Sequence, residues 1–435
     1  GALPRYGLGN NLGANGAVAG LNLGGPLRGE KLLFFVNLEN RNLRSFSLNR
    51  ITNPLVADST GAAAALSNCA ATAAQCAAAA ALIQSRMNVL APQSSASNAG
   101  LLKIDWHPSE WNAFRASIRE RYDRWPAGMQ TGYVAPNGGA LGHLGMKATT
   151  RVVKLGWTAA VGGSGSNELS FGAYRTRLYS SGSDTGLATG SLGISVAGVT
   201  LGAPDRFKES VRKWRRNEIL DQIDFVAGAH RLQFGVNWAQ SPNWIRELRD
   251  GAGRYEYASL TDFALDITGA AKNYLAFTQS LGTAGRRFRT KEIDIYFQDA
   301  WRVYAPLTVT YGLRWEKEAL PQPQASDSFY YRTGMLPSRN VNFSPRIGVA
   351  YRLGERTTAR VGAGMFYAPF SMELIDTLTQ GHAKFVPSIT VARTNATGPK
   401  FPNIVTGVGL IPAGSKNLAY PGFKFKNPYT PQVSV

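Results

Sequence analysis

The sequence predicts an all-β fold, and three features of its 435 residues support that prediction. Large apolar residues alternate with small or polar ones over long runs, which is the two-residue period of a β-strand. Only 17% of the residues are charged, whereas a typical globular chain has about a quarter, and glycine reaches 47 residues. Short turn-forming segments separate consecutive runs. Together these features indicate antiparallel hairpins.

The clearest alternating run covers residues 307–316. One face would carry Leu307, Val309, Tyr311, Leu313 and Trp315, and the other Thr308, Thr310, Gly312, Arg314 and Glu316. Such runs last roughly 10–14 residues, whereas strands of soluble sandwiches have about five or six. At about 3.3 Å per residue and a tilt near 40°, 13 residues rise about 33 Å, enough for a membrane apolar band of about 25 Å. The predicted fold class is therefore part of an antiparallel transmembrane β-barrel of about 12–13 strands.

The connections between the predicted strands alternate in length. Short turns are expected at Pro26–Lys31, His107–Trp111, Gly162–Ser166, Ala227–Arg231, Ala305–Pro306 and Gly354–Arg356. Long polar segments are expected near 46–98, 126–147, 180–215, 241–288, 318–341 and 370–426. In outer-membrane barrels the short turns face the periplasm and the long loops face the exterior. Residues 61–85 and 259–267 have helical character within two of these loops.

A membrane-spanning helix is not expected. The longest uncharged run, between Asp58 and Arg86, is mostly alanine and lacks the large apolar side chains that drive insertion. The net charge of +19 raises the possibility of a nucleic-acid partner, but the basic residues stand singly, often at every second position. Arginine facing a barrel lumen and attraction to anionic lipid head groups explain this surplus better, so we expect no nucleic-acid partner.

The polar faces of the predicted strands supply the candidate lumen-facing residues. They are Arg115, Arg119, Glu292, Asp294, Arg314, Glu316, Arg346 and Arg360. Arginine in the middle of the lipid face costs about 2–4 kcal/mol, so these side chains should face inward. A cationic lumen that favours anionic solutes is one interpretation. The other, which we favour, is that the arginines pair with carboxylates such as Glu120 or with a plug.

Aromatic residues near the predicted periplasmic turns are candidates for an interface girdle, with ordinary sheet packing as the alternative. They are Trp106, Trp111, Phe225, Trp301, Tyr304 and Tyr351. Cys69 and Cys76 would lie about 10.5 Å apart on one straight helix, too far to bridge. A disulfide therefore requires a break between them, and two free thiols are an equal alternative.

No catalytic, cofactor or metal site stands out. The four histidines, His107, His143, His230 and His382, fall at predicted turns or in loops, and no two have the spacing of metal ligands on a helix. No serine or aspartate is recognisable as a nucleophile oriented by histidine. The sequence therefore predicts neither an enzyme nor a bound cofactor.

Several segments resemble a known family. They are GGPLRGEKLLFF at 24–35, HRLQFGV at 230–236, YFQDAWRV at 296–303, LTVTYGLRWE at 307–316, FSPRIGVAY at 343–351 and KNPYTPQ at 426–432. In this order they resemble TonB-dependent outer-membrane receptors of the Oar-like group. The resemblance implies a three-part protein: an N-terminal regulatory-like β domain, a plug, and a barrel of about 22 strands.

Against that family pattern, residues 1–435 are interpreted as part of the barrel, its N-terminal half, without plug, TonB box or regulatory-like domain. The resemblance implies a location in the bacterial outer membrane and energised uptake of a nutrient, driven by the TonB complex acting on a plug. The expected partners are outer-membrane lipid and lipopolysaccharide, TonB and an unidentified ligand. A structural or adhesive surface protein and a passive porin of about 16–18 strands are the alternatives.

Overall fold

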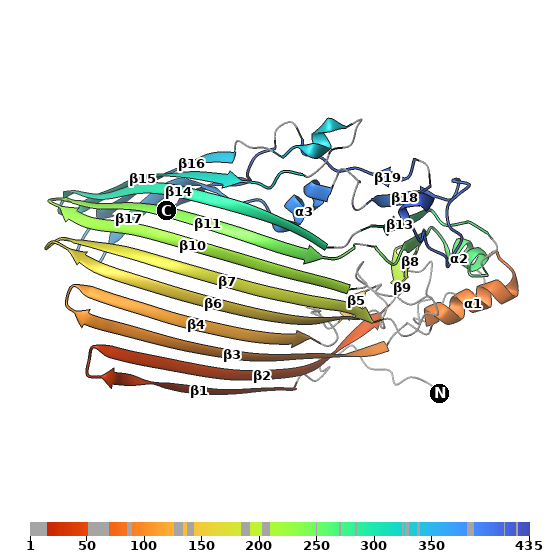
Figure 1. Cartoon of the computed structure of the whole chain (residues 1–435), viewed down its shortest axis with the longest axis horizontal. Coiled ribbons are helices and arrows are strands. Elements are labelled where there is room, and N and C mark those ends of the chain that lie inside the picture. Colours follow the sequence, from red (N-terminus) through yellow and green to blue (C-terminus); the bar gives the residue numbers. More distant parts are fainter. Residues whose placement is uncertain are drawn as a thin grey trace.

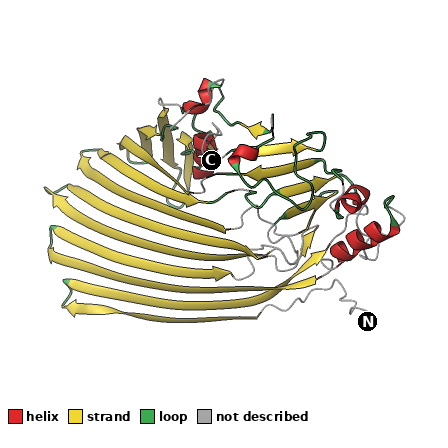
Figure 2. Ribbon diagram, turned by 45° about the vertical axis from the view of Figure 1, so that its right-hand side comes forward, coloured by secondary structure: helices red, strands yellow, loops and turns green. Residues whose placement is uncertain are grey.

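The computed structural model describes the greater part of the chain. The described residues are 15–50, 69–84, 89–125, 134–136, 143–183, 192–201, 209–248, 250–268, 271–282, 285–323, 326, 330–336, 340–380, 387–412, 414–422 and 425–435. They form one large curved sheet of long strands and a smaller sheet, gathered with most of the helices at one end (Figures 1 and 2).

The large sheet has fourteen strands, of which thirteen follow one another in antiparallel order and β5 (Val134–Pro136) pairs with β2. The thirteen are β1 (Asn15–Arg28), β2 (Leu32–Arg50), β3 (Val89–Ser109), β4 (Asn112–Trp125), β6 (His143–Val161), β7 (Gly165–Ser183), β10 (Glu209–Ala227), β11 (His230–Arg246), β14 (Gly285–Tyr304), β15 (Leu307–Ala319), β16 (Asn340–Arg352), β17 (Thr358–Tyr367) and β20 (Tyr429–Ser434). Along the described chain, β1 and β20 are the two edges, so the sheet is an open arc. The predicted antiparallel barrel portion of 12–13 strands is thereby confirmed.

The six predicted short turns are confirmed, and all lie at the same end of the sheet (Figure 1). Three of them place glycine in the left-handed region, at Gly29 with a φ of 53° and at Gly162 and Gly228 with a φ of 61°. A side chain is strained in that region, which explains glycine at these tight hairpins.

The predicted strand lengths were too short. Most strands of the large sheet have 13–21 residues, and β3 is the longest at 21. The predicted loop at 46–98, for example, loses its first and last residues to β2 and β3. Alternation signals a strand only where one face is apolar, whereas the hydrogen-bond ladder continues where both faces meet water.

One face of the large sheet is apolar across neighbouring strands, and we call it the outer face. Opposite residues in an antiparallel pair lie on the same face, and the register places Ile295 opposite Val236 and Trp315, and Ile347 opposite Tyr311. Ile295 and Ile347 are 47% and 56% exposed. A continuous exposed apolar surface of this kind fits contact with lipid, not with water.

The smaller sheet is assembled from the long loops of different hairpins. Its strands are β8 (Gly193–Val196), β9 (Val199–Leu201), β12 (Arg254–Tyr257), β13 (Ala276–Ser280), β18 (Ser388–Ala392) and β19 (Lys416–Asn417). Helices α1 (Ala73–Gln84) and α2 (Leu260–Asp266) pack with this sheet around one buried core, and η3 (Val408–Leu410) lies in the same loops. We call the six strands with α1 and α2 the cap. The sequence did not predict this sheet, because its pairings join segments far apart in the chain.

The helices of the cap match the two segments with helical character. Ser259 caps α2, accepting a hydrogen bond from the Asp262 backbone N–H at 3.1 Å, as an N-cap serine should. α1 covers residues 73–84 of the 61–85 segment, of which residues 61–68 and 85 lie outside the described residues. Within the described chain, no helix combines the length and apolar character required to cross a membrane.

Candidate functional site

The face of the large sheet opposite the apolar one is polar, and we call it the inner face. All eight candidate lumen residues lie on it, because each alternates with an outer-face neighbour in the register. Asp294 lies opposite Glu316, and Arg115 lies opposite Asp105. Helix α3 (Met372–Gln380) packs against the same face near the cap end.

The middle of the inner face holds an ion-pair network centred on Arg314. Its guanidinium lies 2.8 Å from Asp294 and 2.9 Å from Glu316. Asn237 donates to Asp294 at 2.9 Å, and Ser344 donates to Glu316 at 3.0 Å. The strands β11, β14, β15 and β16 thus each supply one or more side chains to this network. Asn237 and Ser344 add hydrogen bonds from neutral groups to the two carboxylates.

A second network lies next to it on β7, β10 and β14. Arg216 contacts Glu218 at 3.0 Å and Glu292 at 2.8 Å, and the Tyr174 hydroxyl donates to Glu218 at 2.7 Å. Arg115 lies 4.0 Å from Asp105, and the Arg346 guanidinium lies 4.6 Å from the Phe366 ring centre. Arg119 and Arg360 are exposed on the same face. Because most of these cations have an acidic or aromatic partner, the structure favours the pairing interpretation over a uniformly cationic lumen.

Helix α3 is fastened to the cap end of the inner face by a buried ion pair. Arg286 donates to the two carboxylate oxygens of Asp376 at 2.9 and 2.8 Å, a bidentate arrangement with fixed geometry. On its apolar side, Ile375 and Leu378 join a buried cluster with Phe288 and other residues. The ion pair and the apolar cluster therefore hold α3 in a defined position against the inner face, near the cap.

A pocket of about 550 Å³ opens between α3 and the inner face. Its strand side is formed by Tyr174, Thr176, Arg212, Trp214, Arg215, Arg216, Ser241, Asn243, Ile245, Glu247 and Glu292, and its other side by Pro369, Phe370, Met372, Glu373 and Asp376. Arg212 and Glu247 form an ion pair of 2.8 Å in this lining. Aromatic surface beside charges of both signs can hold a small polar solute by stacking and hydrogen bonds.

The sequence analysis missed this pocket because it assigned 370–426 to a loop. One signal was present: Met372, Ile375 and Leu378 recur every third residue, as expected for a helix with one apolar side. The strand residues of the pocket, such as Tyr174 and Trp214, gave no comparable signal, because only the fold brings them under α3.

The candidate girdle residues lie at the short-turn end of the sheet. Trp106 and Trp301 are 47% and 38% exposed, and Tyr304 and Tyr351 both lie opposite Leu307, the first residue of β15. Phe225 faces Leu232 across the hairpin, and Trp111 lies in the turn between β3 and β4. The Trp106 ring stacks on Phe114 at 5.2 Å between centres. The six residues thus all lie at or beside the short turns, where an interfacial girdle would be expected.

The histidines do not come together. His230 lies 2.7 Å from Asp299 through Nδ1 and stacks on Trp301, at the short-turn end. His107 lies at the end of β3 and His143 begins β6, while His382 is outside the described residues. Within the described chain, no group of three or more histidine, cysteine or acidic side chains has the arrangement of a metal site.

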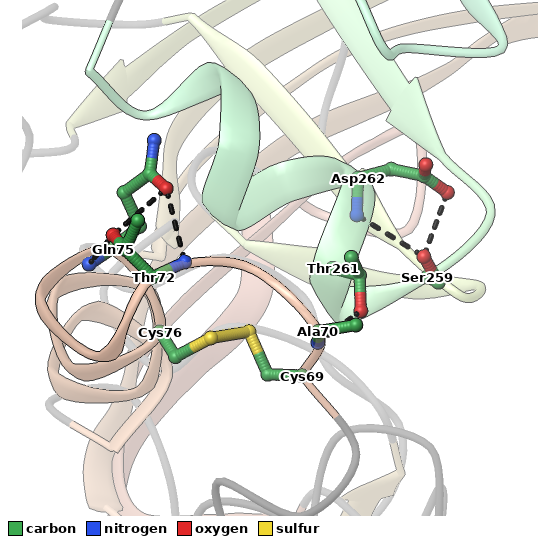
Figure 3. Close-up of a disulfide and its surroundings, with 8 residues drawn as sticks. All are labelled: Cys69, Ala70, Thr72, Gln75, Cys76, Ser259, Thr261 and Asp262. Carbon is green, nitrogen blue, oxygen red and sulfur yellow. Dashed lines mark hydrogen bonds between the residues drawn. A yellow bond between two sulfur atoms is a disulfide. The ribbon is translucent and has the colours of Figure 1, made fainter.

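The two cysteines form a disulfide with a Cα–Cα distance of 5.9 Å. Figure 3 shows Cys69 on the segment before α1 and Cys76 inside the helix, so the helix begins between them. The Thr72 hydroxyl donates to Gln75 at the helix start, and the Ala70 N–H donates to Thr261 of α2. The disulfide thus closes the start of α1 within the loop between β2 and β3, and the Ala70–Thr261 bond joins this loop to α2.

Comparisons with known proteins agree with this architecture. Residues 17–435 match the family described as outer membrane beta barrel domain. Two solved structures have a TM-score of 0.51 at 11% identity: the outer membrane transporter YddB from Escherichia coli and a variant of the ferric enterobactin receptor PfeA from Pseudomonas aeruginosa. They cover 89% and 88% of this chain, which spans only 42% and 46% of theirs, so the likeness shows the fold alone. No curated protein matches the sequence.

Proposed function

Because the chain belongs to the outer membrane β-barrel domain family and is a protein of the bacterial outer membrane, we propose that it forms part of the wall of a TonB-dependent receptor of the Oar-like group. In this proposal residues 1–435 are a portion of the barrel. The receptor takes up a nutrient by a transport mechanism that requires energy from the TonB complex. The observation that carries the proposal is the pocket of about 550 Å³ under α3, at the loop end of the polar inner face.

The position of the pocket suits the capture of a solute arriving from outside. Helix α3, which forms one side of the pocket, lies at the end of the sheet away from the short turns (Figure 1). In outer-membrane barrels this is the exterior end. The bidentate Arg286–Asp376 pair holds α3 over the inner face. A solute bound there would be exposed to the outside while resting on the strands that form the passage.

The same inner face suits a plug. Arg119 and Arg360 are exposed on it, far from α3. A plug with acidic surface would pair with them, and the resemblance to TonB-dependent receptors implies such a plug and its contact with TonB. Enzymatic activity is not part of this proposal, since the similar solved structures are a transporter and a receptor.

The decisive experiment compares uptake by the source bacterium with and without the gene for the full-length protein. Depletion of low-molecular-weight compounds from defined medium would be followed by mass spectrometry, with and without a proton ionophore. We expect at least one compound to be consumed more slowly by the deletion strain, and consumption by the complemented strain to require the proton gradient. Unchanged consumption of every compound would reject a transport role.

A variant at the pocket adds a test of the site. Asp376→Asn removes the charge that pairs with Arg286 and should slow uptake of the same compound, because α3 loses a charge-assisted contact. Asp262→Asn makes the same change in α2 of the cap and is the matched control. Equal uptake by the two variants would mean that the pocket under α3 takes no part in transport.

An adhesive or structural role is the second candidate, and the cap favours it. The cap is a folded unit on the loop side, with its own core and a disulfide, so it presents a fixed surface to the exterior. Loss of cell–cell or cell–surface attachment in the deletion strain, with every uptake rate unchanged, would favour this role over transport.

A further inference from the structure

The outer face carries basic side chains where it approaches the cap end. Four of them, Lys213, Arg215, Arg287 and Arg289, line one cavity of about 590 Å³ on β10, β11 and β14. The register places Trp244 opposite both Lys213 and Arg287, and Pro242 opposite Arg289. These residues share the face that carries the outer-face apolar residues of the same strands. These cations therefore lie on the lipid-facing side, where arginine and lysine are costly at mid-membrane.

The height of these side chains explains why they are tolerated. Lys291 is ten residues from Trp301 of the aromatic girdle on β14, which is about 33 Å along the strand and about 25 Å along the barrel axis at a tilt near 40°. That distance equals the apolar band of an outer-membrane barrel. On β14 the cations thus begin where the hydrocarbon ends.

The same spacing recurs on β10, two strands away in the sheet. Ten residues separate Phe225 from Arg215 on this strand. Arg215 lies opposite Arg175 in the register, so the cations continue onto the next strand. The result is a basic band at the level of the head groups in the outer leaflet.

The cavity has the chemistry of a phosphate site. None of its eight lining residues is acidic. The Lys213 ammonium lies 4.6 Å from the centre of the Trp244 ring, which holds the lysine stem along the face. Arginine side chains in a group bind phosphate through paired N–H donors. Arg287 and Arg289 are two residues apart on one strand, so both point outward from the same face.

We propose that this cavity binds the phosphate groups of a phosphorylated glycolipid, the lipid A part of lipopolysaccharide, in the outer leaflet. The apolar surface directly below Arg215 and Arg289, which includes Ile219, Trp238 and Ile293, would contact its acyl chains. A lipid fits better than a free anion because these cations lie on the lipid-facing side and adjoin this apolar surface. Arg215 and Asn243 also line the pocket under α3, whereas Lys213, Arg287 and Arg289 line this cavity alone.

The test uses the full-length protein in mild detergent and purified diphosphoryl lipid A as the probe. The triple variant Arg215→Gln, Arg287→Gln, Arg289→Gln should bind lipid A on the order of a hundredfold more weakly, since each cation near anionic lipid contributes about a factor of five. The matched control, Arg115→Gln, Arg119→Gln, Arg360→Gln, removes the same charge from the inner face and should bind lipid A like the wild type. Native mass spectrometry of the lipid-bound fraction provides the measurement.

Two further probes separate the sources of phosphate. Dephosphorylated lipid A should bind equally weakly to the wild type and the triple variant. Inorganic phosphate that displaces lipid A at comparable concentration would show a free-anion site and overturn the lipid proposal, as would a triple variant that binds lipid A normally.

Heat-modifiable migration on a gel verifies that each barrel is folded. If the triple glutamine variant does not fold, two other variants replace it: the triple lysine variant (R215K, R287K, R289K), which keeps the charge, and the single variant Arg287→Gln, which removes one charge. Arg287→Gln should then bind lipid A more weakly than the triple lysine variant. Equally strong binding by these two variants would overturn the proposal.

Discussion

The large sheet and the cap are both built from strands in which apolar residues alternate with others. The cap buries its apolar side chains, whereas the large sheet exposes many of those on its outer face. In the cap, Ile194, Tyr255 and Phe277 are each 0% exposed. On the outer face of the large sheet, Ile347 and Phe343 are more than half exposed. Alternation therefore specifies which residues share a face, whereas the surroundings decide whether that face contacts protein or lipid. Four measurements sharpen this contrast, beginning with the largest expected effect.

The first removes an aromatic ring from each region. Phe277→Ala should destabilise the cap by about 3–5 kcal/mol, because the ring is fully buried and lies 4.7 Å from the Tyr255 ring between centres. Phe343→Ala on the outer face should cost clearly less, since lipid chains can occupy the space. Hydrogen exchange of the full-length protein in lipid measures both. Equal losses would mean that the outer face is packed against protein.

The second introduces a charge at the middle of the outer face. Ile295 lies six residues from Trp301 on β14, about halfway across the apolar band. Ile295→Arg should therefore cost about 2–4 kcal/mol in a bilayer. Thr310→Arg on the inner face is the control and should change the denaturant midpoint little. If the two variants unfold at the same midpoint, the assignment of the faces is wrong.

The third removes the disulfide of the cap. A bridge across a separation of seven residues constrains the unfolded chain by about 2.5 kcal/mol in the chain-entropy model. The double variant Cys69→Ser, Cys76→Ser should increase exchange in α1 and leave the strands of the large sheet unchanged. Treatment of the wild type with a reductant should reproduce that pattern. Faster exchange throughout the large sheet would contradict the separation of the two regions.

The fourth effect is absent at neutral pH and develops only in alkali. Burial is the largest cause that raises the pKa of Tyr274 to about 12, and it also raises the pKa values of Tyr255 and Tyr257. A raised folded-state pKa contributes stability that is complete below the ordinary value of 10 and is lost as the pH rises toward the folded value. The cap should therefore loosen above pH 10, with delayed ionisation of these tyrosines in ultraviolet absorbance. Their ionisation at the ordinary pH, without loss of structure, would contradict their burial.

Much of the large sheet could be predicted from the sequence. Runs such as 307–316 have one apolar and one polar face, so the faces of Arg314 and Glu316 followed directly from their positions. Because hairpins join consecutive strands, the strand order followed as well. Strand ends beyond the lipid could not be predicted. β2 and β3 remain paired through residues 46–49 and 89–92, and this pairing joins backbone groups that nearly every residue carries.

The cap and the pocket under α3 could not be predicted for a different reason. β12 pairs in parallel with β8, whose loop lies between two other barrel strands, and β13 pairs with β18, more than a hundred residues later. Such pairings depend on which loops meet above the sheet, and no local pattern specifies that. The disulfide was left open for the same reason, because it depended on where α1 begins relative to Cys69.

The parallel pairing of β8 with β12 also has a mechanical consequence. In a simple barrel each hairpin is held to its neighbours only along the wall, so a force applied to one chain end would extract hairpins singly. Here the loops that follow β2, β7, β11 and β17 all contribute to one core above the wall. Extraction of any of these hairpins would first require that shared core to unfold. Under a pulling force the sheet should therefore release several hairpins together in one step.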